Sequence, residues 1–150
     1  MHRTNMATMI AASLLGVAGC GRSGPATIPV EGRLELAGAN IAVLAGSYIE
    51  AARVDDPSVR SSGVIEADGT FALETQRGGS IARGAPAGKY QVRILLNDDD
   101  RKSHRLAQKT LPTRYLAFQT SGLVIDVPTD DAITLRVSAR SGARAQAAGR

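Results

Sequence analysis

The sequence contains few of the residues from which metal centres, disulfides and hydrolytic sites are built. Its 150 residues include one cysteine, Cys20, and two histidines, His2 and His104. A single cysteine excludes an internal disulfide, and isolated histidines lack the partner ligands that a zinc site needs. Tryptophan is absent, and aromatic residues make up only 3% of the chain. We therefore expect a core of Val, Ile, Leu and Ala, and we predict no metal site, no cofactor and no catalytic residues.

The excess of positive charge is also small. The formal net charge is +4, and it falls to +3 without residues 1–19, which contain Arg3 and no acidic residue. A nucleic-acid-binding domain carries a strongly basic patch or stripe. We therefore expect no nucleic-acid partner.

No hydrophobic run is long enough to span a bilayer. The longest, residues 6–17, has 12 residues, whereas a membrane-spanning helix needs about 20. This run follows Arg3 and ends in Val17-Ala18-Gly19-Cys20, which fits the bacterial lipobox of an apolar residue, two small residues and cysteine. The small residues fit the peptidase cleft, and the thiol accepts the diacylglyceryl group. We predict a lipoprotein signal peptide at 1–19, cleavage between Gly19 and Cys20, and lipidation of Cys20. The alternative is an ordinary signal peptide followed by an unrelated cysteine.

The residues after the lipobox predict where the anchor sits. Stable membrane anchoring takes more than one lipid chain, and a triacylated Cys20 satisfies that requirement. Gly21 stands where an aspartate would signal retention in the inner membrane. We therefore expect a lipid-anchored protein of the bacterial cell envelope, in the outer membrane rather than the inner membrane. Residues 20–28 form the lipidated cysteine and a flexible linker.

Residues 63–75 predict a β-hairpin, because Asp68-Gly69 between apolar-rich runs is a strong turn signal. Two registers fit this stretch. A two-residue turn sets Glu66 opposite Phe71, whereas a three-residue loop with Gly69 left-handed sets Ile65 opposite Phe71. We prefer the second register, because it places the apolar side chains on one face.

The rest of residues 29–139 alternates between apolar and polar residues over short runs, which is typical of half-buried strands. A turn at Pro86 to Gly88 precedes one of these strands. Residues 97–109 are the helix candidate, led by acidic residues and closed by basic ones. Because their apolar content is little more than Leu106, they would form either a surface helix or a loop. Residues 76–86 are expected to form a Gly-rich connection, residues 128–131 a hairpin turn, and residues 140–150 a disordered basic tail. Apart from the hairpin, the expected strands are 29–36, 47–53, 90–94, 123–127 and 133–137. This pattern favours an all-β fold, an antiparallel β-sandwich.

Several motifs in a fixed order resemble the small bacterial lipoproteins with a carboxypeptidase-regulatory-like, or transthyretin-like, domain. The resemblance covers residues 29–139 and the lipobox. It implies a seven-stranded Greek-key sandwich with an accessory role and no catalytic residues. The motif residues are Pro29, Val30, Gly32, Ser62, Gly63, Asp68, Gly69, Phe71, Leu73, Thr75, Gly84, Ala85, Pro86, Gly88, Tyr90, Val92, Ile94, Leu111, Pro112, Arg114, Tyr115, Thr120, Ser121, Gly122 and Leu123.

Other features could carry chemistry, but each has a simpler interpretation. His104 is expected to be a solvated side chain. Residues 98–100, three aspartates, could collect Ca²⁺, but they lack the spaced ligands of a calcium loop and fit a helix start better. Tyr115 and Phe118 are the aromatic residues left over for a glycan site. Arg140 and the two later arginines of the tail could contact anionic lipid, although a solvated tail fits them better.

These observations predict a non-enzymatic, lipid-anchored envelope protein whose sandwich is a binding or assembly module. Its partners are the membrane, through Cys20, and either envelope proteins or cell-wall glycan. The first alternative is a binding module for cell-wall glycan or peptide. The second is a small hydrolase of the hydroxyisourate type, but the chain ends Ala148-Gly149-Arg150 and lacks the C-terminal Tyr-Arg-Gly-Ser of those enzymes. An open sheet edge could also add a strand from a partner.

Overall fold

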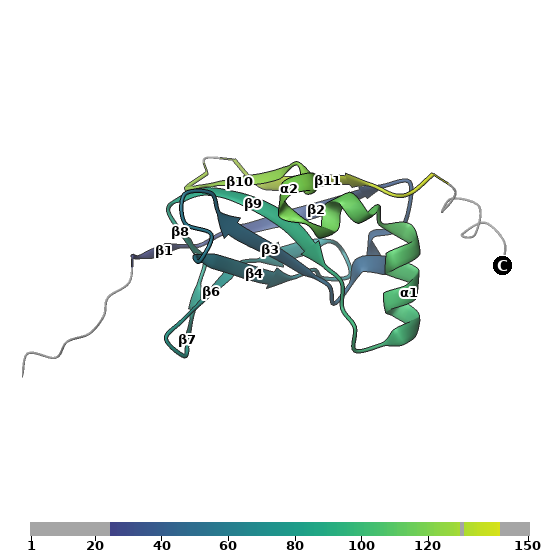
Figure 1. Ribbon diagram of the computed structural model, residues 1–150, viewed down its shortest axis with the longest axis horizontal. Helices are drawn as coiled ribbons and strands as arrows, with labels where there is room; N and C mark the ends of the chain where they lie inside the picture. Colours follow the sequence, from purple (N-terminus) through teal and green to yellow (C-terminus); the bar gives the residue numbers. More distant parts are fainter. Residues whose placement is uncertain (1–24, 130, 142–150) are drawn as a thin grey trace, which may run out of the picture.

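The computed structural model describes residues 25–129 and 131–141. The predicted signal peptide, Cys20 and the tail beyond Ser141 lie outside these described residues. Within them the protein is mostly β, as expected (Figure 1). The strands are β1 (Thr27–Ile28), β2 (Glu31–Ala37), β3 (Tyr48–Arg53), β4 (Arg60–Val64), β5 (Thr70–Ala72), β6 (Glu74–Arg77), β7 (Ser80–Arg83), β8 (Ala85–Pro86), β9 (Gly88–Leu95), β10 (Leu123–Val127) and β11 (Ile133–Ser138).

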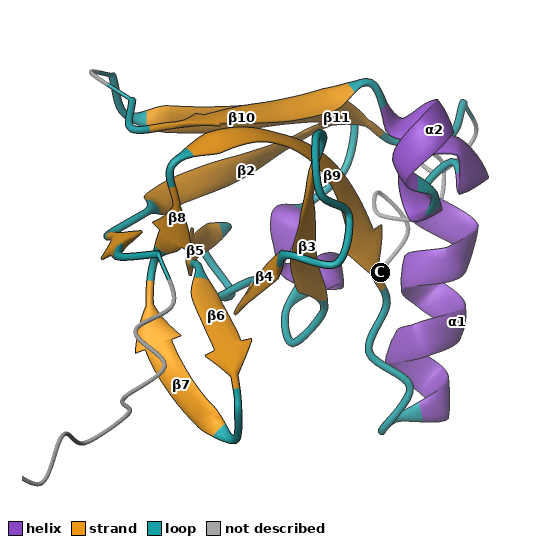
Figure 2. Ribbon diagram, turned by 60° about the vertical axis from the view of Figure 1, so that its left-hand side comes forward, coloured by secondary structure: helices purple, strands orange, loops and turns teal. Residues whose placement is uncertain are grey.

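Two larger sheets enclose the core. One has six strands in the order β10-β9-β3-β4-β6-β7, and the other has three in the order β11-β2-β5. β1 and β8 form a separate pair. Figure 2 shows β2 and β11 above β3 and β4. The sandwich-like, all-β architecture is therefore confirmed. It departs from the purely antiparallel expectation at one pair, because β11 runs parallel to β2.

Alternation along the strands places one apolar face of each sheet in the core. Tyr90, Val92 and Ile94 of β9 are at most 1% exposed, and they belong to the same buried cluster as Leu34 of β2. Intervening residues such as Gln91 remain in water. Each fully buried Val, Leu or Ile contributes about 1.5–3 kcal/mol relative to an exposed one, so the core is stable without tryptophan.

The turn expected at residues 66–70 has the register of the three-residue loop. The backbone N–H of Glu66 donates to the Thr70 carbonyl oxygen at 2.9 Å, and Gly69 adopts a φ of +88°. Further along, Ser62 stands opposite Glu74 in the same register. The second strand of the hairpin is divided, however. β5 pairs with β2, whereas β6 pairs with β4, so this run joins the two sheets.

The Gly-rich connection expected at residues 76–86 is instead a hairpin of β6 and β7. Gly78 and Gly79 form its turn, with φ of +52° and +85°. Two consecutive residues with positive φ are typical of two-residue hairpin turns. β7 is an edge strand whose Ile81 is 69% exposed, so it lacks the buried face that produces alternation. Pro86 lies in β8 and Gly88 opens β9, with the bend at Ala87.

The prediction of a hairpin turn at residues 128–131 is wrong. β10 pairs with β9, while β11 joins the other sheet beside β2. The chain therefore crosses between the sheets here. Alternation shows that one face of each strand is buried, but it does not identify the neighbouring strand.

Helical turns occupy two connections. η1 (Ile41–Leu44) precedes β3, and α1 (Arg101–Thr110), η2 (Thr113–Leu116) and α2 (Phe118–Ser121) lie between β9 and β10. The expected surface helix is α1, which packs against η1 at one end of the sandwich (Figures 1 and 2). Ala107 faces the protein, whereas Leu106 is 51% exposed. η1, η2 and α2 were not expected, because each is only four residues long.

Asp100 caps α1, and its removal gives a testable result. Its carboxylate accepts hydrogen bonds from the backbone N–H groups of Ser103 and Lys102 at 2.8 and 3.4 Å. Hydrogen bonds from Ser103, and to a smaller extent from Lys102, lower the pKa of Asp100. Stabilisation is therefore present above the unfolded pKa of about 3.9 and is lost as the pH falls through the lower folded pKa.

Asp100→Ala should lower the thermal midpoint at neutral pH, and the difference from wild type should shrink on acidification. Asp99→Ala, on the same loop, is the control. Equal effects of the two variants would contradict the capping role.

Candidate functional site

The outward face of the six-stranded sheet carries a row of exposed apolar side chains. Tyr48 of β3 stands opposite Leu95 of β9 on one side and Val64 of β4 on the other. Their exposed fractions are 39%, 48% and 41%. The row arises because Ile49 and Ala51 point into the core, so Tyr48 must point out. Three exposed apolar residues in one cross-strand row are a contiguous patch rather than scattered surface residues.

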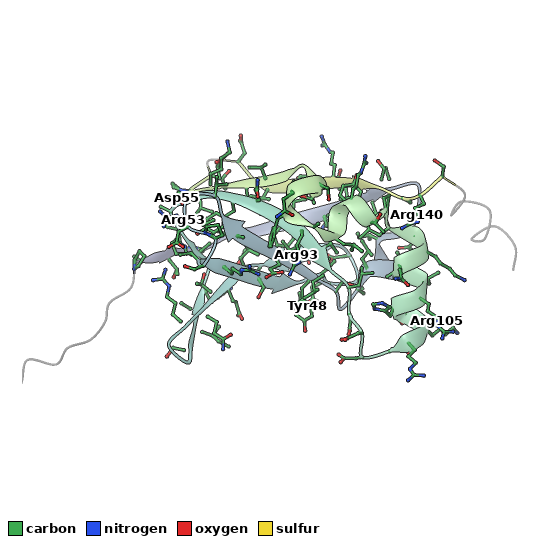
Figure 3. The ribbon with its side chains drawn as sticks, in the orientation of Figure 1. Tyr48, Arg53, Asp55, Arg93, Arg105 and Arg140 are labelled. Carbon is green, nitrogen blue, oxygen red and sulfur yellow. The ribbon has the colours of Figure 1, made fainter. Side chains whose placement is uncertain are left out.

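A second, polar row lies beside the first and is centred on Glu50. Its carboxylate binds Arg60 of β4 at 2.9 Å and Arg93 of β9 at 2.6 Å. Both guanidinium groups lie over the ring of Phe118 from α2, at 5.5 and 4.8 Å from its centroid. Cation–π contacts add to the ion pairs. Arg60 is therefore held in place at the edge of the apolar row. Arg93 and Tyr48 are labelled in Figure 3.

The two rows border a hollow in the surface, which we call the trough. It consists of three adjoining depressions of about 430, 300 and 330 Å³. The first two share Tyr48, Ser62 and Glu74, and the last two share Val64, Glu66 and Ala72. The trough thus runs across the strands from β9 to β2. Its lining residues are Glu31, Gly32, Tyr48, Glu50, Ser58, Arg60, Ser61, Ser62, Gly63, Val64, Glu66, Thr70, Phe71, Ala72, Glu74, Gln76 and Leu95.

The charge of the trough is uneven along its length. Arg60 and its partner Glu50 both lie at the Leu95 end. Glu31 and Glu66 are the charged groups that line the opposite end. This end is acidic in a chain that is basic overall. The trough offers an apolar floor with carboxylates along its sides, which is suited to binding an extended ligand.

The residues singled out in the sequence lie elsewhere. Tyr115 is buried, and its hydroxyl accepts a hydrogen bond from the Ser138 backbone N–H at 3.2 Å, so it is no glycan platform. Phe118 is half-buried beneath the two arginines. His104 is half-buried, and its Nδ1 lies 2.9 Å from the Asn97 carbonyl oxygen.

The three expected acidic residues of the helix start do not form a ligand set. Asp98 and Asp99 are exposed, while Asp100 is engaged as the α1 cap. In the described part of the chain, no three His, Cys, Asp or Glu side chains gather closely enough to hold a metal ion. Asp68 and Gly69 lie in the turn between β4 and β5. A hydrogen bond from Thr70 lowers the pKa of Asp68, which fits a turn-stabilising carboxylate.

The ion pair of Arg53 and Asp55, and also Arg140, lie outside the trough. Arg53 and Asp55 form a two-fold hydrogen-bonded ion pair, with both contacts at 2.6 Å. This pair lowers the pKa of Asp55 and lies at the far end of β3 from Tyr48 (Figure 3). Arg140, at the start of the expected tail, donates from its backbone N–H to the Thr110 carbonyl oxygen at 2.8 Å.

Comparison with family models, curated proteins and solved structures gives no match for this chain. Among the described residues, no helix has the length and apolar character needed to cross a bilayer.

Proposed function

We propose that the protein is a lipid-anchored binding or assembly module of the bacterial cell envelope. The observation that carries the binding role is the trough, because it places exposed Tyr48, Val64 and Leu95 in one row beside ordered polar groups. Exposed apolar patches of this kind are typical of interaction sites. The anchor is proposed from the lipobox at Cys20, and outer-membrane placement from Gly21.

We propose further that the domain belongs with the transthyretin-like lipoproteins and has their seven-stranded Greek-key plan. Two motif glycines support this proposal, because each stands where a side chain would collide. A Cβ atom at Gly63 would lie 2.2 Å from the Ala72 carbonyl oxygen, and one at Gly32 would lie 2.6 Å from the Phe71 ring. The motif tyrosine, Tyr90, donates from its hydroxyl to the Pro86 carbonyl oxygen at 2.8 Å. The resemblance therefore involves residues that hold the core together.

Cell-wall glycan is the second candidate ligand. One observation favours it: Tyr48 is an exposed aromatic ring beside hydroxyl, amide and carboxylate side chains. A sugar ring could pack on Tyr48 while its hydroxyl groups bond to Ser62 and Gln76.

Replacement of the lipobox cysteine tests the proposed anchor. Cys20→Ser lacks the thiol that receives the diacylglyceryl group, so the protein should leave the membrane fraction or remain as the uncleaved precursor. The measurement is fractionation of cells with immunoblotting for size and location. Ser23→Ala, in the predicted linker, is the control and should stay membrane-bound. A Cys20→Ser protein that is fully processed and still in the membrane fraction would contradict the anchor.

A further inference from the structure

We infer that the trough binds an extended, basic segment of a partner polypeptide. This inference deepens the proposed function and rests on it for the binding role of the trough. Three properties lead to this ligand class: the direction and length of the trough, the chemistry of its floor, and the sign of its charge.

The trough has room for a short stretch of extended chain. It crosses β9, β3, β4, β5 and β2, where Leu95, Tyr48, Val64, Ala72 and Glu31 follow one another. Three of the four steps join paired strands, which lie about 4.8 Å apart, so these steps alone measure about 14 Å, and the step from β4 to β5 between the two sheets adds to that length. An extended polypeptide therefore needs at least about five residues to cover the path, at about 3.3 Å per residue. The openness of the face to solvent allows the segment to enter from the side.

The floor favours amino-acid side chains over sugar rings. Apart from Tyr48, its exposed apolar residues are aliphatic, namely Leu95, Val64 and Ala72. The other aromatic residue in the lining, Phe71, is 3% exposed and offers no platform. A glycan chain of the same length would meet a single stacking ring. Aliphatic side chains or the stems of lysine and arginine would instead contact the whole row.

The charge of the trough selects a basic segment. Glu66 and Glu74 line its middle, and no ion pair engages either of them within the described residues. Glu31 adds a third carboxylate at the β2 end, with only an exposed, 3.5 Å contact to Arg83. The guanidinium in the lining, Arg60, is already bound to Glu50. An acidic segment would be repelled, whereas lysine or arginine side chains would pair with the carboxylates on both sides of the floor.

The test uses three probes with the full-length protein in mild detergent. Fluorescently labelled Lys-Val-Lys-Val-Lys-Val represents the proposed ligand, the matched Glu-Val-Glu-Val-Glu-Val represents the opposite charge, and a hexamer of N-acetylglucosamine represents a neutral glycan. Fluorescence anisotropy measures binding of each probe at low salt. The basic peptide should bind tightest, and its affinity should fall with increasing salt.

Paired variants separate the trough from general surface charge. Glu66→Gln with Glu74→Gln should weaken binding of the basic peptide by about tenfold, because two favourable charge contacts are lost. The control pair, Glu35→Gln with Asp126→Asn, makes the same change in net charge outside the trough and should leave the affinity within about twofold. Tyr48→Ala should weaken binding by a comparable factor through the loss of apolar contact. Thermal melting checks that every variant is folded.

Each outcome decides the inference. Preferential binding of the basic peptide that depends on Glu66, Glu74 and Tyr48 supports it. Equal binding of both peptides, equal effects of the two variant pairs, or no peptide binding overturns it. Binding of the glycan alone, sensitive to Tyr48→Ala, overturns the basic-peptide ligand but leaves the proposed binding module standing. Loss of the membrane anchor would appear in the fractionation of Cys20→Ser and not in these titrations.

Discussion

Gly84→Ala should cost the domain about 3–5 kcal/mol of stability, a large share of the total for a domain of this size. Gly84 adopts a φ of +88°, and a Cβ atom there would lie 1.9 Å from the carbonyl oxygen of Ile28. The obstacle is backbone, which cannot rotate away as a flexible side chain can. Gly84 also donates to the Leu73 carbonyl oxygen at 2.6 Å, so a shift of its backbone would strain the junction of the two sheets.

The measurement is urea unfolding followed by circular dichroism, with Gly78→Ala as the matched control. Gly78 also has a positive φ, +52°, but a Cβ atom there has no neighbour within 4 Å. This control should cost only about 1–2 kcal/mol, the penalty of the left-handed conformation alone. If the two variants lose the same stability, the collision with Ile28 is not the cause.

Thr75→Val should also destabilise the domain strongly, by about 2–6 kcal/mol, although the side chain keeps its size. Thr75 is 1% exposed, and its hydroxyl donates to the Gly84 carbonyl oxygen at 2.7 Å. The Ser61 hydroxyl lies 2.7 Å from the same Thr75 oxygen and is itself 2% exposed. A methyl group in place of the hydroxyl leaves both buried partners without this bond, and each unsatisfied group costs about 1–3 kcal/mol.

Two further variants test this hydroxyl pair. Thr134→Val makes the same substitution at an exposed position of β11 and should change stability by less than about 0.5 kcal/mol. The double variant Ser61→Ala with Thr75→Val should lose less stability than the sum of the two single losses. The reason is that Ser61→Ala removes the hydroxyl that Thr75→Val would leave without a partner. Strict additivity in urea unfolding would argue against the shared buried network.

The sequence was informative wherever one face of a strand is buried. Apolar and polar residues alternate along β2, β9, β10 and β11. The local sequence of each strand therefore predicts which of its residues are buried. The turn before β5 was also predictable, because Gly69 alone satisfies the positive φ that the register requires. In contrast, β7 has no buried alternation to detect, since Ile81 at the sheet edge faces solvent.

The pairing of strands required the structure. β11 lies parallel to β2 through contacts between residues about a hundred positions apart, such as Leu135 and Leu34. Alternation in either strand carries no information about that partner. For the same reason, the trough could not be predicted from the sequence. Tyr48, Val64 and Leu95 come from three strands, and each alone is an ordinary exposed apolar residue.

The aromatic residues show that excluding the expected core positions does not identify the exposed side chains. Because Tyr115 lies outside the alternating runs, the sequence predicts that it is a surface residue. In the structure it is 4% exposed, and the backbone of Ser138 satisfies its hydroxyl. Tyr48 is exposed instead, because its neighbour Ile49 takes the inward position in β3. A shift of one residue along β3 would exchange these two positions.

Intact-mass spectrometry of the full-length protein, purified from membranes in mild detergent, tests the proposed lipid anchor at Cys20. We expect a mature chain that begins at Cys20 and carries lipid on that residue. A lipidated chain together with a basic envelope polypeptide in the same native complex would also support the partner proposed for the trough. A chain that retains residues 1–19, or that begins at an unmodified Cys20, would contradict the account of a lipid-anchored envelope protein.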